Sequence, residues 1–152
     1  MSETIYDALR ESHEIQRSLC RELLMSKPHT QHRIATFSEL RVELAAHAAA
    51  EERFLYAPIL MDDMGLYSSR HALHEHHEID ELVEELQKKD TSGRGWLATA
   101  KKLSHEVHHH LSEEEKKFFQ VSGKILGDSQ KRTLARQYRK DYTRMLKVLR
   151  QT

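Results

Sequence analysis

The sequence predicts an all-α fold, an up-down-up-down four-helix bundle with an additional C-terminal helix. Three observations support this fold class. Among 152 residues only 5 are Gly and 2 are Pro, so few positions interrupt a helix. Apolar residues recur at steps of three and four, which is the period of a helix that buries one face. The breaks between the periodic segments are short, and short connections favour antiparallel neighbours.

Five helices are expected, separated by loop and turn signals. The first is expected at residues 4–25, with Ser2 as its cap. Pro28 lies in the loop that follows, Gly65 closes a turn, and Gly93 lies in a further loop. The other helices are expected at residues 31–60, 68–88, 95–121 and 129–150. The second helix is expected to bury Ile34, Phe37, Leu40, Leu44 and Leu55.

Composition and charge exclude several classes of protein. The chain has 24 basic and 24 acidic residues, so a broad nucleic-acid-binding surface is not expected. The single Cys20 excludes an intrachain disulfide and fits a reducing compartment. No apolar run approaches the roughly 20 residues of a membrane span, and the N-terminus lacks the apolar core of a signal peptide. A cytoplasmic protein without nucleic-acid or membrane partners is therefore predicted.

Histidine is enriched, and two histidines stand in a repeated pattern. The chain has 12 histidines, against an expectation of about two or three per hundred residues. His47 is followed four residues later by Glu51, and His110 is followed four residues later by Glu114. Residues four apart lie on one helical face, about 40° from each other, so each pair can bind one metal centre. In both copies an aromatic residue, Tyr56 or Phe119, comes nine residues after the histidine.

Two more histidines are expected at the same depth in the bundle. His13 lies about 12 residues before its loop and His76 about 13 before the next, whereas His47 lies about 17 and His110 about 16 residues after these loops. Four imidazoles and two carboxylates exceed the needs of one tetrahedral zinc ion. They suit two metal ions with shared carboxylates, and the lack of thiolates favours iron or manganese. The predicted metal ligands are His13, His47, Glu51, His76, His110 and Glu114.

These motifs resemble the hemerythrin-like family, also called the HHE cation-binding domain. The matching motifs are Ser12-His13, His47-Ala-Ala-Ala-Glu51-Glu52, Glu75-His76-His77-Glu78 and His109-His110-Leu111-Ser112-Glu113-Glu114, within about residues 4–122. The resemblance implies a bundle around two non-heme iron ions, with a bridging oxo or hydroxo group. Zinc or manganese can take the place of iron in such a site. It implies that a small diatomic ligand, O2 or NO, binds at the metal site. A protein that binds or senses O2, NO or iron is favoured over an enzyme. The alternative is a diiron redox enzyme for peroxide or NO reduction or for iron–sulfur repair.

The sequence departs from the respiratory hemerythrins at two places. Those proteins carry His-xxx-His on the third helix and His-xxxx-Asp on the fourth. Here His76 is followed at +4 by Asp80, and the fourth helix offers Glu114 after His110. Fewer histidines and an extra carboxylate favour a redox or iron-handling role over reversible oxygen carriage.

Two choices of ligand stay open at this point. His77 is the alternative to His76, and His109 with Glu113 is the alternative to His110 with Glu114. His76 is preferred because apolar residues follow it at +3, +6, +7 and +10. His110 is preferred because Phe119 then repeats the spacing between His47 and Tyr56.

The last helix differs from the rest of the chain in charge. Residues 128–152 carry 8 basic and 2 acidic residues, whereas residues 1–127 carry 16 basic and 22 acidic ones. We expect a metal-binding bundle at residues 1–127 and a basic amphipathic helix at residues 128–152. This helix is expected to pack on the acidic bundle. The alternative is a homodimer or a partner docked through the C-terminal helix.

Overall fold

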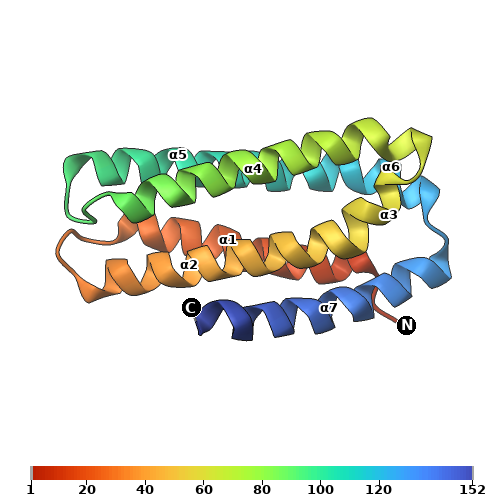
Figure 1. The fold of residues 1–152 in the computed structure, drawn as a ribbon, viewed down its shortest axis with the longest axis horizontal. Helices are drawn as coiled ribbons and strands as arrows, with labels where there is room; N and C mark the ends of the chain where they lie inside the picture. The colour runs from red at the N-terminus through yellow and green to blue at the C-terminus, as the bar shows by residue number, and fades with distance from the viewer. Residues whose placement is uncertain (1, 152) are drawn as a thin grey trace.

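A computed structural model describes residues 2–151 and confirms the all-α bundle with an extra C-terminal helix (Figure 1). Across this described part there is no strand. The long helices are α1 (Ile5–Met25), α2 (Gln31–Glu51), α4 (Leu66–Lys88), α5 (Arg94–Glu113) and α7 (Asp128–Arg150). The short elements are η1 (Glu52–Tyr56), α3 (Ala57–Leu60), η2 (Asp63–Gly65), η3 (Glu114–Phe118) and α6 (Phe119–Ile125).

Helices α1, α2, α4 and α5 form the four-helix bundle. The loop between α1 and α2 lies at the same end of the bundle as the loop between α4 and α5 (Figure 1). Helix α7 returns along the bundle and packs against α1 and α2. None of the helices in the described residues is long and apolar enough to cross a membrane.

The first helix begins one residue later than expected, and its cap is Thr4 rather than Ser2. The Thr4 hydroxyl accepts from the backbone N–H of Asp7, and the Asp7 carboxylate accepts from the backbone N–H of Thr4. This reciprocal pair satisfies two donors that a helix start leaves without partners. The carboxylate also lies at the positive end of the helix dipole, so both interactions stabilise this start.

Two apolar clusters fill the bundle, one towards each end. Leu23, Leu40, Trp96 and Leu103 belong to the cluster near the two loops. Ile5, Leu9, Leu55, Ile59 and Tyr138 belong to the cluster at the other end. A layer of buried histidine and glutamate side chains lies between the two clusters, and every bundle helix contributes to it. Apolar packing on both sides therefore holds this polar layer in place.

The expected burial of Ile34 is wrong, and Arg33 is buried in its place. Ile34 is 47% exposed, whereas Arg33 is 2% exposed. The Arg33 guanidinium donates to the Ser26 carbonyl at 2.6 Å and to the Thr91 carbonyl at 3.0 Å, and it lies 5.1 Å from the centre of the Trp96 ring. It therefore ties both loops together over the apolar core. Apolar periodicity alone cannot find a buried cation that is satisfied by backbone carbonyls.

We expect Arg33→Met to destabilise the protein by about 2 kcal/mol, because buried carbonyls at Ser26 and Thr91 lose their donors while the packing stem remains. Chemical denaturation followed by circular dichroism measures this. Arg21→Met, at an exposed position of α1, is the control. A loss no larger than that of the control would show that Arg33 does not hold the loops.

A π-helical segment begins directly after Glu51 and another begins at Glu114, so the uninterrupted helices expected at residues 31–60 and 95–121 are not observed. The segments are Glu52–Tyr56 and Glu114–Phe118. At about 100° per residue, nine residues of α-helix would place Tyr56 about 180° from His47. A π turn accommodates one extra residue, so the nine steps rotate the chain by about as much as eight α-helical steps. This leaves about 80° between His47 and Tyr56. Both side chains thus face the interior.

Helix α7 is held to the bundle by polar contacts as well as by its apolar stripe. Arg139 forms ion pairs with Glu3 and Glu11 of the N-terminal region. Asp141 pairs with Arg53 at 2.8 Å. The Tyr142 hydroxyl donates to Glu43 at 2.5 Å. The Arg139 and Tyr142 contacts join the last helix to acidic groups of the bundle, whereas Asp141 joins it to a basic one.

Candidate metal centre

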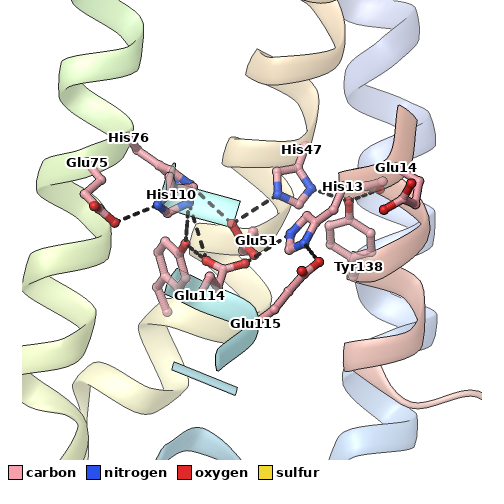
Figure 2. A network of polar contacts seen from close by, with 12 residues as sticks. His13, Glu14, His47, Glu51, Glu75, His76, His110, Glu114, Glu115 and Tyr138 are labelled. Carbon is pink, nitrogen blue, oxygen red and sulfur yellow. Dashed lines mark hydrogen bonds and ion pairs between the residues drawn. The ribbon is translucent and has the colours of Figure 1, made fainter. Parts of the chain in front are cut away.

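The six residues predicted as metal ligands meet in one buried layer (Figure 2). Each bundle helix or its π-helical extension contributes to the layer. His13 comes from α1, His47 and Glu51 from α2, His76 from α4, His110 from α5, and Glu114 from the first position of η3. All six are at most 5% exposed. The side chains point towards one another, although they are far apart in the sequence.

The layer divides into two groups that share both carboxylates. His13, His47, Glu51 and Glu114 form the first group, and His76, His110, Glu51 and Glu114 form the second. Within each group, one ligand atom per residue lies within 4.8 Å of all the others. We call the side of the layer that holds His13 and His47 the first lobe. The side that holds His76 and His110 is the second lobe.

Both carboxylates lie between the two lobes. Oε1 of Glu51 lies 3.2 Å from Nε2 of His47 and 3.2 Å from Nε2 of His76. Glu114 places Oε1 3.1 Å from Nε2 of His13 and Oε2 3.5 Å from Nε2 of His110. Metal–ligand lengths of about 2.1 Å separate ligand atoms by about 3.0–3.5 Å. The spacing therefore suits metal binding, and Glu51 and Glu114 lie within reach of both lobes.

Every histidine of the layer uses its outer nitrogen, Nδ1, for a polar contact and points Nε2 inward. These outer contacts are His13 with Glu115 at 2.7 Å, His76 with Glu52 at 2.8 Å, His110 with Glu75 at 2.8 Å and His47 with the Tyr138 hydroxyl at 2.8 Å. Such contacts fix the ring orientation and the tautomer that leaves Nε2 free to bind a metal. The rings are therefore preorganised as ligands.

The sequence analysis did not identify these four outer partners. A signal exists for three of them, because Glu52 and Glu115 directly follow predicted ligands and Glu75 directly precedes one. Tyr138 has no such signal, since it lies on the apolar stripe of the last helix. It reaches the layer only because α7 packs against α1 and α2, where its hydroxyl also contacts Ser12 at 2.7 Å.

The aromatic residues of the repeated pattern make the two lobes different. The Tyr56 hydroxyl forms a short hydrogen bond with Glu114 and lies 3.3 Å from Nε2 of His76. At the corresponding place near the first lobe, Phe119 stacks on the His13 ring with centroids 5.9 Å apart. A hydroxyl group thus borders the second lobe, where the first lobe has an apolar ring.

The pKa values of the two buried carboxylates, Glu51 and Glu114, shift in opposite directions. Burial and the neighbouring charge of Glu51 raise the pKa of Glu114. Burial opposes ionisation of Glu51 as well, but the charge of the neighbouring His47 helps to hold the pKa of Glu51 well below the usual range. Burial, followed by the charges of Glu114 and Glu51, raises the pKa of Tyr56 well above its usual value. Tyr56 therefore keeps its proton at neutral pH.

Several buried polar atoms of the layer have no hydrogen-bond partner in the described chain, and a metal ion would supply one. Among residues 2–151 the buried atoms without a hydrogen-bond partner include Nε2 of His13, Nε2 of His47, both oxygens of Glu51 and Oε1 of Glu114. Leaving such groups without partners costs about 1–3 kcal/mol each. A divalent ion in each lobe would satisfy them, and the donor set of nitrogen and oxygen suits iron, manganese or zinc.

Metal binding at pH 7 is expected to release at least two protons per chain. Burial lowers the pKa of His13, but contacts with Glu114 and Glu115 outweigh it and raise this pKa to about 9. In the same way Glu51 and Glu52 overcome burial and raise the pKa of His76 to about 10. Both rings thus carry a proton at pH 7 that a metal must displace. Fewer protons are released as the pH rises through about 9 for His13 and about 10 for His76. Calorimetric titration in buffers of different ionisation enthalpy measures the number, and zero release at pH 7 would contradict this.

The comparisons with known proteins agree with this geometry. The model of the hemerythrin HHE cation-binding domain matches residues 4–121. This chain belongs to the hemerythrin HHE cation-binding domain family. A crystal structure of a hemerythrin HHE cation-binding domain-containing protein from Mycobacterium kansasii is similar in fold, with a TM-score of 0.87 at 19% identity over 96% of this chain and 89% of that one. A search of curated proteins found no match.

Membership of the HHE cation-binding family and the buried histidine and glutamate cluster together indicate metal binding in general terms. The structure also shows which of the alternative histidines lie in the buried layer. His77 and His109 are exposed, and neither belongs to the two buried groups, whereas His76 and His110 do. Asp80, at +4 from His76, is likewise outside both groups. The fourth-helix carboxylate of this HHE chain is Glu114, which reaches both lobes.

Two cavities adjoin the layer in this HHE domain. The smaller, of about 10 Å³, is lined by His47, His76, His110 and the buried Gln16, among others. The larger, of about 210 Å³, opens beside the second lobe, and its walls include His110, Glu114 and Phe118. The larger cavity thus lies on the side of the second lobe.

We expect Tyr138→Phe to weaken metal binding in the first lobe of the HHE site by about 10–100-fold, the usual cost of losing an outer partner of a histidine ligand. The change removes the contact to His47 and leaves the second lobe untouched. Tyr142→Phe is the matched control, because it removes a hydroxyl one turn further along α7 that contacts Glu43 instead. Stepwise titration with Co2+ measures both affinities. Equal affinities in Tyr138→Phe and the control would contradict the expectation.

Proposed function

We propose that this chain is a non-heme diiron protein that binds or senses O2, NO or iron inside its bundle. The observation that carries the proposal is the pair of four-residue groups that share Glu51 and Glu114. In this proposal His13 and His47 hold one ion, His76 and His110 hold the other, and the two carboxylates bridge them. Bound iron would supply redox chemistry and open positions for a small ligand.

The surroundings of the layer support a small ligand rather than a large one. The cavity beside His47, His76 and His110 measures about 10 Å³, which is about the space of one water molecule. Gln16 lines it and is 2% exposed. Its amide nitrogen has no hydrogen-bond partner among the described residues. A cavity of this size excludes a large ligand, and the Gln16 amide would supply a donor to a small one.

The experiment that tests the proposal is anaerobic loading with ferrous iron, followed by exposure to O2 or to NO. Binding predicts about two irons per chain and a change of the visible spectrum on adding either gas. Gln16→Leu removes the donor without touching a ligand, and it should speed the release of O2 or NO while leaving the iron content unchanged. Iron uptake without any response to O2 or NO would contradict gas binding and would leave iron itself as the sensed species.

One observation favours the alternative, a diiron redox enzyme for peroxide or NO reduction. The second lobe combines the larger cavity with the Tyr56 hydroxyl, which donates to Glu114. Because Tyr56 keeps its proton at neutral pH, its hydroxyl would act there as a hydrogen-bond donor that holds Glu114 in place. An enzyme predicts many turnovers of hydrogen peroxide with an added reductant, and a loss of about 100-fold in kcat for Tyr56→Phe. A single turnover per centre would exclude this alternative.

A further inference from the structure

A second cluster of histidine and glutamate lies outside the buried layer, at the mouth of the larger cavity. It repeats the His-xxx-Glu spacing on two neighbouring helices, with His71 and Glu75 on α4 and His109 and Glu113 on α5. The two histidines are about half exposed, at 42% and 57% for their side chains. The cluster is therefore open to ions in solution, unlike the buried layer.

The inward nitrogens of both histidines converge on both carboxylates. Nε2 of His71 lies 3.1 Å from Glu113 and 3.5 Å from Glu75. Nε2 of His109 lies 3.0 Å from Glu113 and 3.8 Å from Glu75. His71, Glu75 and Glu113 offer ligand atoms that all lie within 4.8 Å of one another, and His109 joins this group at its edge, close to Glu113 but farther from Glu75. The shorter separations match the about 3.0–3.5 Å that ligands of one ion keep from each other. Two imidazoles and two carboxylates form a donor set that suits divalent iron, manganese, cobalt or zinc.

Other histidines on the same helix show what an ordinary surface pair looks like. His74 contacts Glu78 at 3.3 Å, and His77 contacts Glu81 at 2.9 Å, each pair with the same spacing on α4. Both histidines are more exposed, at 68% and 69%. Each of these two pairs brings together only two groups from one helix. The outer cluster differs because a second helix completes it to four groups.

Glu75 connects the outer cluster to the buried layer. Its Oε1 contacts Nδ1 of His110 at 2.8 Å, whereas its Oε2 faces His71 and His109. The cavity of about 210 Å³ has His71, Glu75 and Glu113 in its wall together with His110 and Glu114 of the second lobe. An ion held by the outer cluster would thus stand on the open side of the second lobe.

We propose that His71, Glu75, His109 and Glu113 form a third divalent-cation site, through which metal ions reach the buried layer. The site is complete without the buried ions, so its existence does not depend on the proposed diiron function. Its role in loading does rest on that function. Two negative carboxylates at a cavity mouth raise the local concentration of cations and so raise the rate of capture.

Titration with Co2+ alone, by equilibrium dialysis and visible absorption, tests the site. We expect about three Co2+ per wild-type chain and about two for His71→Ala/His109→Ala. The matched control is His74→Ala/His77→Ala, which removes two exposed histidines of α4 and should keep about three. Circular dichroism of each variant shows that the helices are intact.

The outcomes separate this proposal from the diiron proposal. Equal numbers of Co2+ in the wild type and in His71→Ala/His109→Ala would overturn the third site, and two ions in both would leave the diiron proposal standing. Loss of an ion in the His74/His77 control as well would also overturn it, because the ion would then belong to scattered surface histidines. A single ion in the wild type that disappears in His71→Ala/His109→Ala would support the third site and sink the diiron proposal.

The rate of loading tests the role of the site. We expect the buried centre of His71→Ala/His109→Ala to fill about 10-fold more slowly at low Co2+ concentration, with unchanged final occupancy of the two buried positions. Stopped-flow absorption measures this rate against the control variant. Loading at the rate of the control would overturn the role in loading.

Discussion

Glu51→Gln is expected to empty both metal positions of the buried layer, not one. Oε1 of Glu51 is equidistant from Nε2 of His47 and Nε2 of His76, at 3.2 Å from each, so both proposed ions share this oxygen. Gln keeps the shape but loses the negative charge that offsets two divalent ions. We expect the iron content to fall from about two per chain to near zero. Elemental analysis by mass spectrometry after loading with ferrous iron measures it.

Two comparison variants make this result specific. Glu43→Gln changes another buried glutamate of α2, which contacts Tyr142 instead of the layer, and should keep both irons. His76→Ala should lose the iron of the second lobe first, because His76 belongs to one group only. If Glu51→Gln binds as much iron as Glu43→Gln, the bridging role of Glu51 is wrong.

Metal binding is expected to raise the thermal stability of the protein strongly. The metal-free layer buries four imidazoles and two carboxylates, several of whose atoms have no hydrogen-bond partner within the described chain. Each ion present at about 1,000 times its dissociation constant adds about 4 kcal/mol, so two ions add about 8 kcal/mol. For a domain of this size that corresponds to a rise in Tm of about 15–30 °C. Differential scanning calorimetry with and without ferrous iron under anaerobic conditions measures the shift.

The stability shift has its own control in Glu51→Gln. This variant keeps a similar packing volume but should show almost no change in Tm when iron is added. A shift as large as that of the wild type would mean that iron stabilises the protein from another position, such as the exposed cluster around Glu113. A wild type whose Tm does not respond to iron would contradict a metal centre inside the bundle.

The positions of the ligand candidates could be predicted because helical spacing is local and regular. His47 with Glu51, and His110 with Glu114, share a helical face whatever the rest of the chain does. Their common depth with His13 and His76 follows from antiparallel packing of helices joined by short loops. The choice of His76 over His77 also came from local information, because the apolar residues after it indicate which face is buried.

The π-helical segments could have been predicted from one clue that was present in the spacing. An aromatic residue nine positions after a histidine points to the opposite face of an ordinary α-helix. Two buried copies of that spacing, at Tyr56 and Phe119, require an extra residue in each helix. The segments themselves contain no Gly, so nothing in their residue types marks a break. For this reason the contact between the Tyr56 hydroxyl and Glu114 did not follow from the residue types.

The contributions that depend on tertiary contacts could not be predicted from sequence. Tyr138 contacts His47 across 91 positions of the sequence, and no local pattern relates the two residues. Arg33 is buried because backbone carbonyls of two separate loops accept from it, an environment that exists only in the folded chain. Tertiary hydrogen bonds thus decided the burial of both polar residues.

The measurement that tests the central claim most directly is the metal content of the protein purified without added metal, paired with its absorption spectrum in air. A diiron centre in the buried layer predicts about two irons per chain and a near-ultraviolet band from oxo-bridged ferric iron. The contradicting result is a protein without metal that also takes up no ferrous iron under anaerobic conditions. The layer around Glu51 and Glu114 would then be a network of buried ion pairs rather than a metal centre.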